Sequence, residues 1–122
     1  MNTFSVTAFY DKDQPSHCHI ATTKEIYNIP LDDVLFIECR QKKSLVHMKK
    51  ETLILPVPLY RLREILPAPT FIQTHRSFLV NLKNIYHIDK HADPWTVSFF
   101  HSDQHAYISR SFRRQVMEII TD

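Results

Sequence analysis

The amino-acid sequence predicts one domain of the mainly β class with two short helices. Most apolar residues occur in short runs rich in β-branched and aromatic side chains, and turn-forming residues separate these runs. Only two segments show the three- and four-residue apolar spacing of a helix. The chain has 122 residues, a length that fits one domain with its own core.

Nine segments are predicted to be β-strands. In WTVSFF, apolar and polar residues alternate, so Trp95, Val97 and Phe99 share one face. This alternation predicts that one face of the strand packs on a core and that the other does not. The predicted strands are residues 4–10, 25–29, 34–39, 44–48, 52–55, 70–74, 85–88, 95–100 and 106–109.

Two segments are predicted to be helices. In PLYRLREILP, Pro58 and Pro67 favour a helix that begins and ends near them, at about 58–66. In SRSFRRQVMEII, a helix near 110–120 would gather its apolar residues in one stripe. The cations opposite that stripe are Arg110, Arg113 and Arg114. The residues predicted to be buried in the whole domain are Phe36, Leu45, Leu62, Val80, Val97, Phe99 and Ile108.

The composition excludes several classes of enzyme. Glycine is absent, although Walker loops, dinucleotide-binding turns and nucleophile elbows all need it. No Ser/His/Asp set is recognisable, so no enzymatic activity is expected. Eight histidines are present, but no spacing supplies four zinc ligands. We therefore expect neither a metal nor a cofactor.

The two cysteines indicate a reducing compartment. Cys18 and Cys39 lack CxxC spacing and are too few for a disulfide framework. The first residues lack the basic and apolar regions of a signal peptide, and no apolar run approaches the roughly 20 residues of a membrane span. A cytoplasmic protein with two free thiols is the expectation.

Positive charge is unevenly distributed along the chain. The formal charge is −4 over residues 1–38 and +6 over residues 39–122. Three stretches, 39–50, 65–88 and 104–117, contain no carboxylate. Because these stretches hold most of the cations after residue 38, each is a candidate for contact with phosphate.

The order of the motifs resembles the LytTR DNA-binding domain family. An acid-led strand LDDVLFIEC precedes a cationic loop RQKKS, and the helix PLYRLREIL precedes FIQTHRSFLVNLKNIYHI, a hairpin and ISRSF. The portion with HRS and LVN is the most specific. The resemblance covers roughly residues 24–120, within a domain of residues 24–122, and residues 1–23 are expected to form an N-terminal extension packed on it. The family habitually has glycine in its first loop and final hairpin, and this chain does not.

The resemblance implies an elongated stack of small antiparallel sheets with two short helices. Its connecting loops would enter successive major grooves of DNA, at residues 40–44, 74–77 and 109–114. Carried over by position and by charge, the DNA-binding residues are Arg40, Lys42, Lys43, Ser44, His75, Arg76, Ser77, Arg110, Ser111, Arg113 and Arg114. These segments coincide with the three stretches that lack carboxylates.

Arg76 lies in the polar break between two apolar runs. Its guanidinium can bond O6 and N7 of guanine together or hold a phosphate. His75 and Ser77 have shorter side chains, and we favour a supporting role for them over direct contact with bases. Leu79 and Val80 are expected in the core, and Asn81 in a turn where it bonds nearby backbone.

Two functions of different class follow from the resemblance. The first is a sequence-specific DNA-binding transcription regulator of bacteria, standing alone or as a response regulator output domain. It would be a monomer in solution and would bind double-stranded DNA as two copies on paired direct repeats. The second is a protein-interaction module that modulates a partner regulator through residues 1–38. Residues 1–23 cannot hold a phosphoacceptor domain, so a complete chain would be controlled by its abundance or by a partner.

Overall fold

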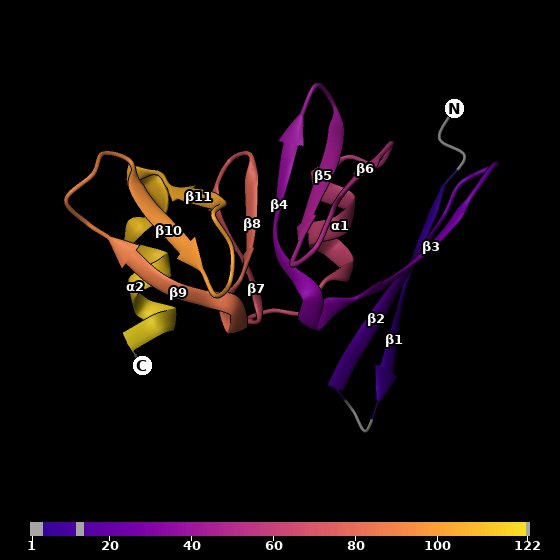
Figure 1. Ribbon diagram of the computed structural model, residues 1–122, viewed down its shortest axis with the longest axis horizontal. Helices are drawn as coiled ribbons and strands as arrows, with labels where there is room; N and C mark the ends of the chain where they lie inside the picture. Colours follow the sequence, from indigo (N-terminus) through magenta and orange to yellow (C-terminus); the bar gives the residue numbers. More distant parts are fainter. Residues whose placement is uncertain (1–3, 12–13, 122) are drawn as a thin grey trace.

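The computed structural model describes residues 4–11 and 14–121, whose strands form three antiparallel sheets side by side in an elongated stack (Figure 1). The first sheet has the order β1 (Ser5–Asp11), β2 (Gln14–Ala21), β3 (Ile26–Pro30). The central sheet has the order β6 (Thr52–Leu55), β5 (Lys43–Met48), β4 (Val34–Arg40), β8 (Phe78–Asn81), β7 (Phe71–His75). The third has the order β11 (His105–Ile108), β10 (Trp95–Phe99), β9 (Ile85–Asp89). The predicted fold class is confirmed.

Two α-helices pack on this stack, one between the first and central sheets and the other against the third sheet (Figure 1). Helix α1 (Leu59–Ile65) follows β6, and α2 (Arg113–Thr121) ends the described chain. Single 3₁₀ turns occur at Leu31–Asp33, Leu82–Asn84 and Arg110–Phe112. The second predicted helix therefore begins as a 3₁₀ turn at Arg110 and becomes α-helical at Arg113. None of the helices in the described residues is long and apolar enough to cross a membrane.

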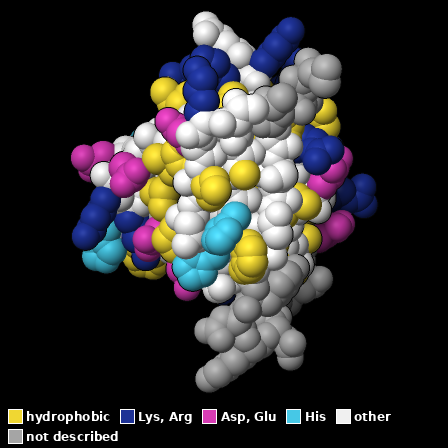
Figure 2. Space-filling model, turned by 90° about the vertical axis from the view of Figure 1, so that its right-hand side faces the viewer, with side chains coloured by type: hydrophobic (Ala, Val, Ile, Leu, Met, Phe, Trp, Pro, Cys, Tyr) yellow, Lys and Arg dark blue, Asp and Glu magenta, His cyan; other side chains and the backbone are white. Residues whose placement is uncertain are grey.

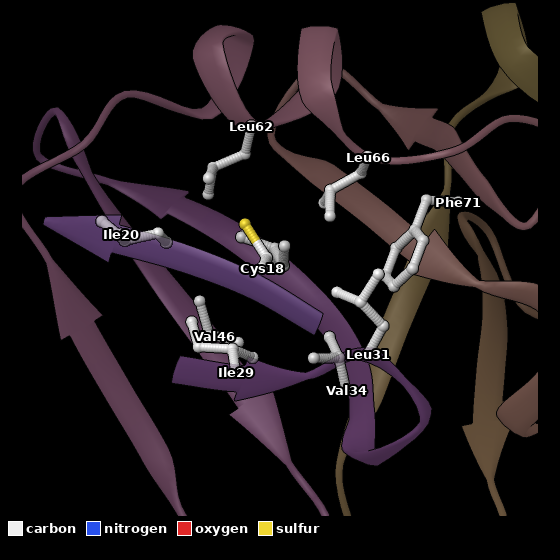
Figure 3. Close-up of a pocket in the computed structure, with 10 residues that line it drawn as sticks. Cys18, Ile20, Ile29, Leu31, Val34, Val46, Leu62, Leu66 and Phe71 are labelled. Carbon is white, nitrogen blue, oxygen red and sulfur yellow. The ribbon is translucent and has the colours of Figure 1, made fainter. Parts of the chain in front are cut away.

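The first core lies between the first sheet, α1 and one face of the central sheet. Cys18 and Ile20 of β2 are buried against Leu62 and Leu66, with the Cys18 thiol pointing toward the helix (Figure 3). The cavity at their centre measures only about 10 Å³ and has an entirely apolar lining, so it is no ligand site. Burial raises the pKa of the Cys18 thiol to about 11, which keeps it protonated and unreactive near neutral pH.

The second core joins the other face of the central sheet to the third sheet and α2. It includes Phe36 of β4, Val80 of β8, Val97 and Phe99 of β10, and Val116 of α2. Phe36 and Phe99 stack with ring centroids 5.2 Å apart, which ties the central sheet to the third. The central sheet is therefore buried on both faces along β4, β7 and β8.

All nine predicted strands are present within one or two residues of their expected bounds, and two further strands were missed. Strand β8 was missed because all four of its residues are buried, so no alternation marks it. Strand β2 was missed because histidines and a proline dilute its apolar signal. Six of the seven residues predicted to be buried are buried, and Leu45 is not. Leu45 lies on β5 and faces the side of the central sheet that carries the second core. The buried residues that this sheet contributes to the second core come from β4, β7 and β8, so Leu45 lies outside that core.

Residues before position 24 contribute directly to the first core. Strand β2 is the middle strand of its sheet, paired with β1 on one side and β3 on the other. Ile20 of β2 is fully buried. The described part of residues 1–23 thus supplies two of the three strands that cover α1 and the central sheet.

The outer face of the first sheet has little positive charge at its centre. Phe9 packs on the His19 ring at 4.2 Å between centroids, and Ile26 is exposed nearby on β3. Figure 2 looks at this end of the molecule and shows histidine and hydrophobic side chains near the centre, with charged side chains around them.

Candidate nucleic-acid interface

Three polar segments lie beside one another at one edge of the stack. They are the β4–β5 turn, the β7–β8 turn and the chain between β11 and α2, all at the top of Figure 1. The N–H of Cys39 donates to the carbonyl of Ser77 at 2.8 Å, which joins the first segment to the second. The N–H of Ser109 donates to the carbonyl of Thr74 at 2.9 Å, which joins the second to the third. Several Lys and Arg side chains gather at this same end in Figure 2.

The β4–β5 turn consists of Gln41 and Lys42, between the paired residues Arg40 and Lys43. Its φ angles are 53° at Gln41 and 65° at Lys42, so both residues occupy the left-handed region, as in type I′ hairpin turns. Glycine or asparagine normally fills such positions, because a side chain costs about 1–2 kcal/mol there. The turn keeps its geometry without glycine, and it projects Lys42 and Lys43 into solvent.

Arg40 is held by a chain of polar contacts on β4 and β5. Its Nη2 donates to Glu38 Oε2 at 2.9 Å, and Nε2 of His47 lies 2.8 Å from Glu38 Oε1. Burial alone would raise the pKa of Glu38, but the hydrogen bonds from His47 and Arg40 outweigh it and hold that pKa below its ordinary value. Glu38 therefore stays ionised and orients Arg40 at the edge of the sheet.

Ser44 does not fit the predicted role in DNA binding. Its side chain is fully buried, and its hydroxyl donates to the carbonyl of Val57 at 2.5 Å. Ser44 follows the exposed Lys43 on β5, and successive residues of a strand point to opposite faces. The serine therefore faces the first core, where it anchors the chain that leads into α1.

The β7–β8 turn presents Arg76 at its tip. The N–H of Ser77 donates to Nδ1 of His75 at 3.0 Å, and the His75 ring packs edge-on against Phe78. These contacts close the turn, in agreement with the supporting role favoured for His75. Arg76 is exposed and forms no ion pair within the described part of the chain. Its guanidinium donors are free to bond an external acceptor.

A helix residue that sequence reasoning did not select also supports this turn. Nη1 of Arg63, on α1, donates to Gln73 Oε1 at 2.7 Å. The amide of Gln73 in turn lies 3.5 Å from the carbonyl of Arg76. Arg63 is ten residues from Gln73 in the chain, so no local pattern could reveal this link.

Asn81, after the turn, fixes the base of the same hairpin. Its Oδ1 accepts from the N–H of Lys83 at 3.0 Å, which is the local bond expected for it. Its buried Nδ2 also donates to the carbonyls of Leu31 and Val34, at 3.2 and 2.9 Å. These two bonds cross about fifty positions of sequence and were not anticipated. They tie β8 to the 3₁₀ turn that begins β4.

The 3₁₀ turn at Arg110–Phe112 and the first turn of α2 carry four predicted site residues in different environments. Arg110 and Ser111 are exposed, and Arg114 is exposed with a loose 3.7 Å contact to Glu118. Arg113 is partly buried instead, with its guanidinium carbon 4.7 Å from the centre of the Trp95 ring. Both Arg110 and Arg113 bond Asp93, which is not among the predicted site residues.

The arrangement defines a mainly β domain with a cationic edge built from turns. Exposed guanidinium and ammonium groups in such a row can bond phosphate oxygens and base edges. The LytTr DNA-binding domain family model matches residues 24–121, and the chain belongs to this family. The family assigned from the sequence motifs is therefore confirmed.

Known proteins resemble the chain in sequence and in fold. Over 77 residues it is 29% identical to the transcriptional regulatory protein YpdB of Escherichia coli K12, a match that covers 63% of this chain and only 30% of YpdB. YpdB of Shigella flexneri matches equally. A LytTr DNA-binding domain from Bacillus cereus, described as belonging to a methyl-accepting/DNA response regulator, has a TM-score of 0.74 at 24% identity. That match covers 88% of this chain and 98% of the other, and it shows the shared fold.

Proposed function

We propose that the chain is a sequence-specific DNA-binding transcription regulator of a bacterial cytoplasm. Its segments 40–44, 74–77 and 109–114 contact successive major grooves. The observation that carries this proposal is the placement of three separate cationic segments along one edge, joined by backbone hydrogen bonds. Membership of the LytTr family and the similarity to YpdB, a transcriptional regulatory protein, support it.

The exposed cations divide between two kinds of contact. Lys42 and Arg114 bond phosphates, because their side chains are exposed and long enough to follow the backbone of a duplex. Arg76 bonds base edges, because a rigid turn presents a guanidinium fork without a competing carboxylate. Arg113 has a structural task instead, since Asp93 and Trp95 already engage its guanidinium.

Replacing Lys42 with Gly should stabilise the fold and weaken DNA binding together. Glycine adopts positive φ without steric cost, so the free energy of unfolding should rise by about 0.5–1 kcal/mol. The lost phosphate contact should weaken binding to any DNA and make the slope of log affinity against log salt concentration shallower by about one. Chemical denaturation and fluorescence anisotropy at several salt concentrations measure the two effects.

His101→Gly is the matched control for this variant. His101 also has positive φ, 58°. Its turn precedes the first residue of β11, whereas Ser109 follows the last residue of that strand. It should stabilise the fold similarly and leave DNA binding unchanged. The proposed interface would be contradicted if wild-type binding to DNA did not depend on salt concentration. It would also be contradicted if wild type and Lys42→Gly bound DNA equally.

We further propose that the protein is a monomer in solution and that two copies occupy paired direct repeats. The repeats are about one or two helical turns apart, so that both copies lie on one face of the duplex. Insertion of about half a turn, roughly 5 base pairs, between the repeats should weaken joint occupancy in a gel-shift titration. A whole-turn insertion is the control. Joint occupancy that is insensitive to the half-turn insertion would rule out this arrangement.

A further inference from the structure

The loop between β9 and β10 reaches the start of α2 through Asp93. Oδ2 of Asp93 accepts from Nη2 of Arg110 at 2.5 Å, and Oδ1 accepts from Nη2 of Arg113 at 2.9 Å. One carboxylate thus bridges two guanidinium groups that lie 17 and 20 residues away in sequence. Charge-assisted hydrogen bonds of this kind are shorter and stronger than neutral ones.

The two arginines differ in what else holds them. The side chain of Arg113 is 27% exposed and lies on the Trp95 ring, which also faces Lys90 at 5.2 Å. The Nε of Arg113 is buried without a hydrogen-bond partner in the described structure. The side chain of Arg110 is 78% exposed. Arg113 therefore anchors the carboxylate on the body of the protein, and the carboxylate presents Arg110 to solvent.

Arg110 keeps a complete recognition face while bound to Asp93. A guanidinium has five N–H donors, and two adjacent faces can each form a pair of parallel hydrogen bonds. The bond to Asp93 uses Nη2 alone. Whichever hydrogen Nη2 donates, one two-pronged face remains free, which is what contact with O6 and N7 of guanine requires.

We propose that Asp93 is a positioning residue that holds Arg110 as a second base-contacting fork, beside Arg76, at the edge assigned to DNA. This inference rests on the proposed function. Arg110 lies next to Ser109, whose N–H bonds Thr74 at the end of β7. The two forks are therefore presented by adjoining segments. Asp93 fixes the rotamer of Arg110 before binding, so less conformational entropy is lost when a guanine is bound.

Asp93→Asn tests whether Asp93 positions Arg110 or only places a negative charge near DNA. The amide has one acceptor oxygen and no charge, so it cannot give each guanidinium group its own oxygen, as Asp93 does, and its bonds lose the assistance of the negative charge. Affinity for a site selected from random DNA should fall about fivefold, which is typical of having to order one long side chain on binding. Affinity for unrelated DNA should stay equal or rise slightly, because a negative charge has left the DNA-facing edge. Anisotropy titrations at one salt concentration give both affinities.

Two further variants make the test decisive. In an Arg110→Ala background, Asp93→Asn should cause no additional loss on the selected site, because Asp93 acts through Arg110. Arg110→Lys keeps the charge but lacks the fork, so it should lose affinity for the selected site alone. This second variant tests the fork even if Asp93→Asn folds poorly.

Each contrary outcome has a distinct meaning. An equal loss on both DNAs would overturn the inference and make Asp93 a structural residue of the loop. An equal gain on both would also overturn it, with Asp93 only repelling phosphate. If wild type selects a site and Asp93→Asn leaves the ratio of the two affinities unchanged, this inference alone fails. If wild type selects no sequence, the proposed function fails with it.

Discussion

Replacing Asn81 with Ala is expected to lower the free energy of unfolding by about 2–3 kcal/mol. The side chain is buried and makes three hydrogen bonds, to the carbonyls of Leu31 and Val34 and from the N–H of Lys83. Each such bond contributes about 1 kcal/mol net. Both carbonyls keep one other donor, Val34 N–H for Leu31 and Asn84 Nδ2 for Val34. The free energy of unfolding should therefore fall by less than it would if the two buried carbonyls were left without any hydrogen-bond donor.

Urea denaturation followed by circular dichroism measures this change. Asn28→Ala is the control, because Asn28 is an exposed asparagine of β3 and its loss should cost no more than about 0.5 kcal/mol. A loss of less than about 1 kcal/mol for Asn81→Ala would mean that the bonds between β8 and the 3₁₀ turn contribute little. In that case the asparagine of the LVN motif would have only its local turn role.

Periodicity predicted the strands where one face is buried and the other is not. In β10, Val97 and Phe99 are buried and Ser98 is only partly so, as the alternation in the sequence requires. Strand β8 lacks this signal because the sheet is covered on both faces there. Its burial depends on two cores that meet only in the folded protein. The partial exposure of Leu45 likewise depends on where the second core ends in the folded protein, so no local pattern distinguished it from Ser44 and Val46, which are buried.

The family resemblance, supported by the charge pattern, predicted which segments lie along the cationic edge, but not how individual cations are used. A run of cations without carboxylates is visible in the sequence, whereas the carboxylate of Asp93 reaches Arg110 and Arg113 from another loop. Ser44 illustrates a local failure of the same reasoning. It follows two lysines in the sequence, yet the strand alternation that begins at Lys43 turns it into the core.

Replacing Arg76 with Ala should cost about 1–3 kcal/mol of binding free energy on the selected site and much less on random DNA. The turn that carries Arg76 is closed by the bond between Ser77 N–H and His75 Nδ1, so the fork is presented from a fixed backbone. A bidentate bond to a base is lost only where the correct base is present. The ratio of the two affinities, measured at one fixed salt concentration, is therefore the informative quantity.

Arg114→Ala is the matched control, because Arg114 is an exposed arginine assigned to phosphate. It should weaken binding to both DNAs alike and make the salt slope shallower by about one. If Arg76→Ala also weakens both DNAs equally, Arg76 is another phosphate contact, and sequence discrimination must come from Lys43, Arg110 or Ser111. If neither affinity changes while the domain remains folded, the β7–β8 turn does not lie at the DNA surface, because a free guanidinium at that surface would contact a phosphate or a base.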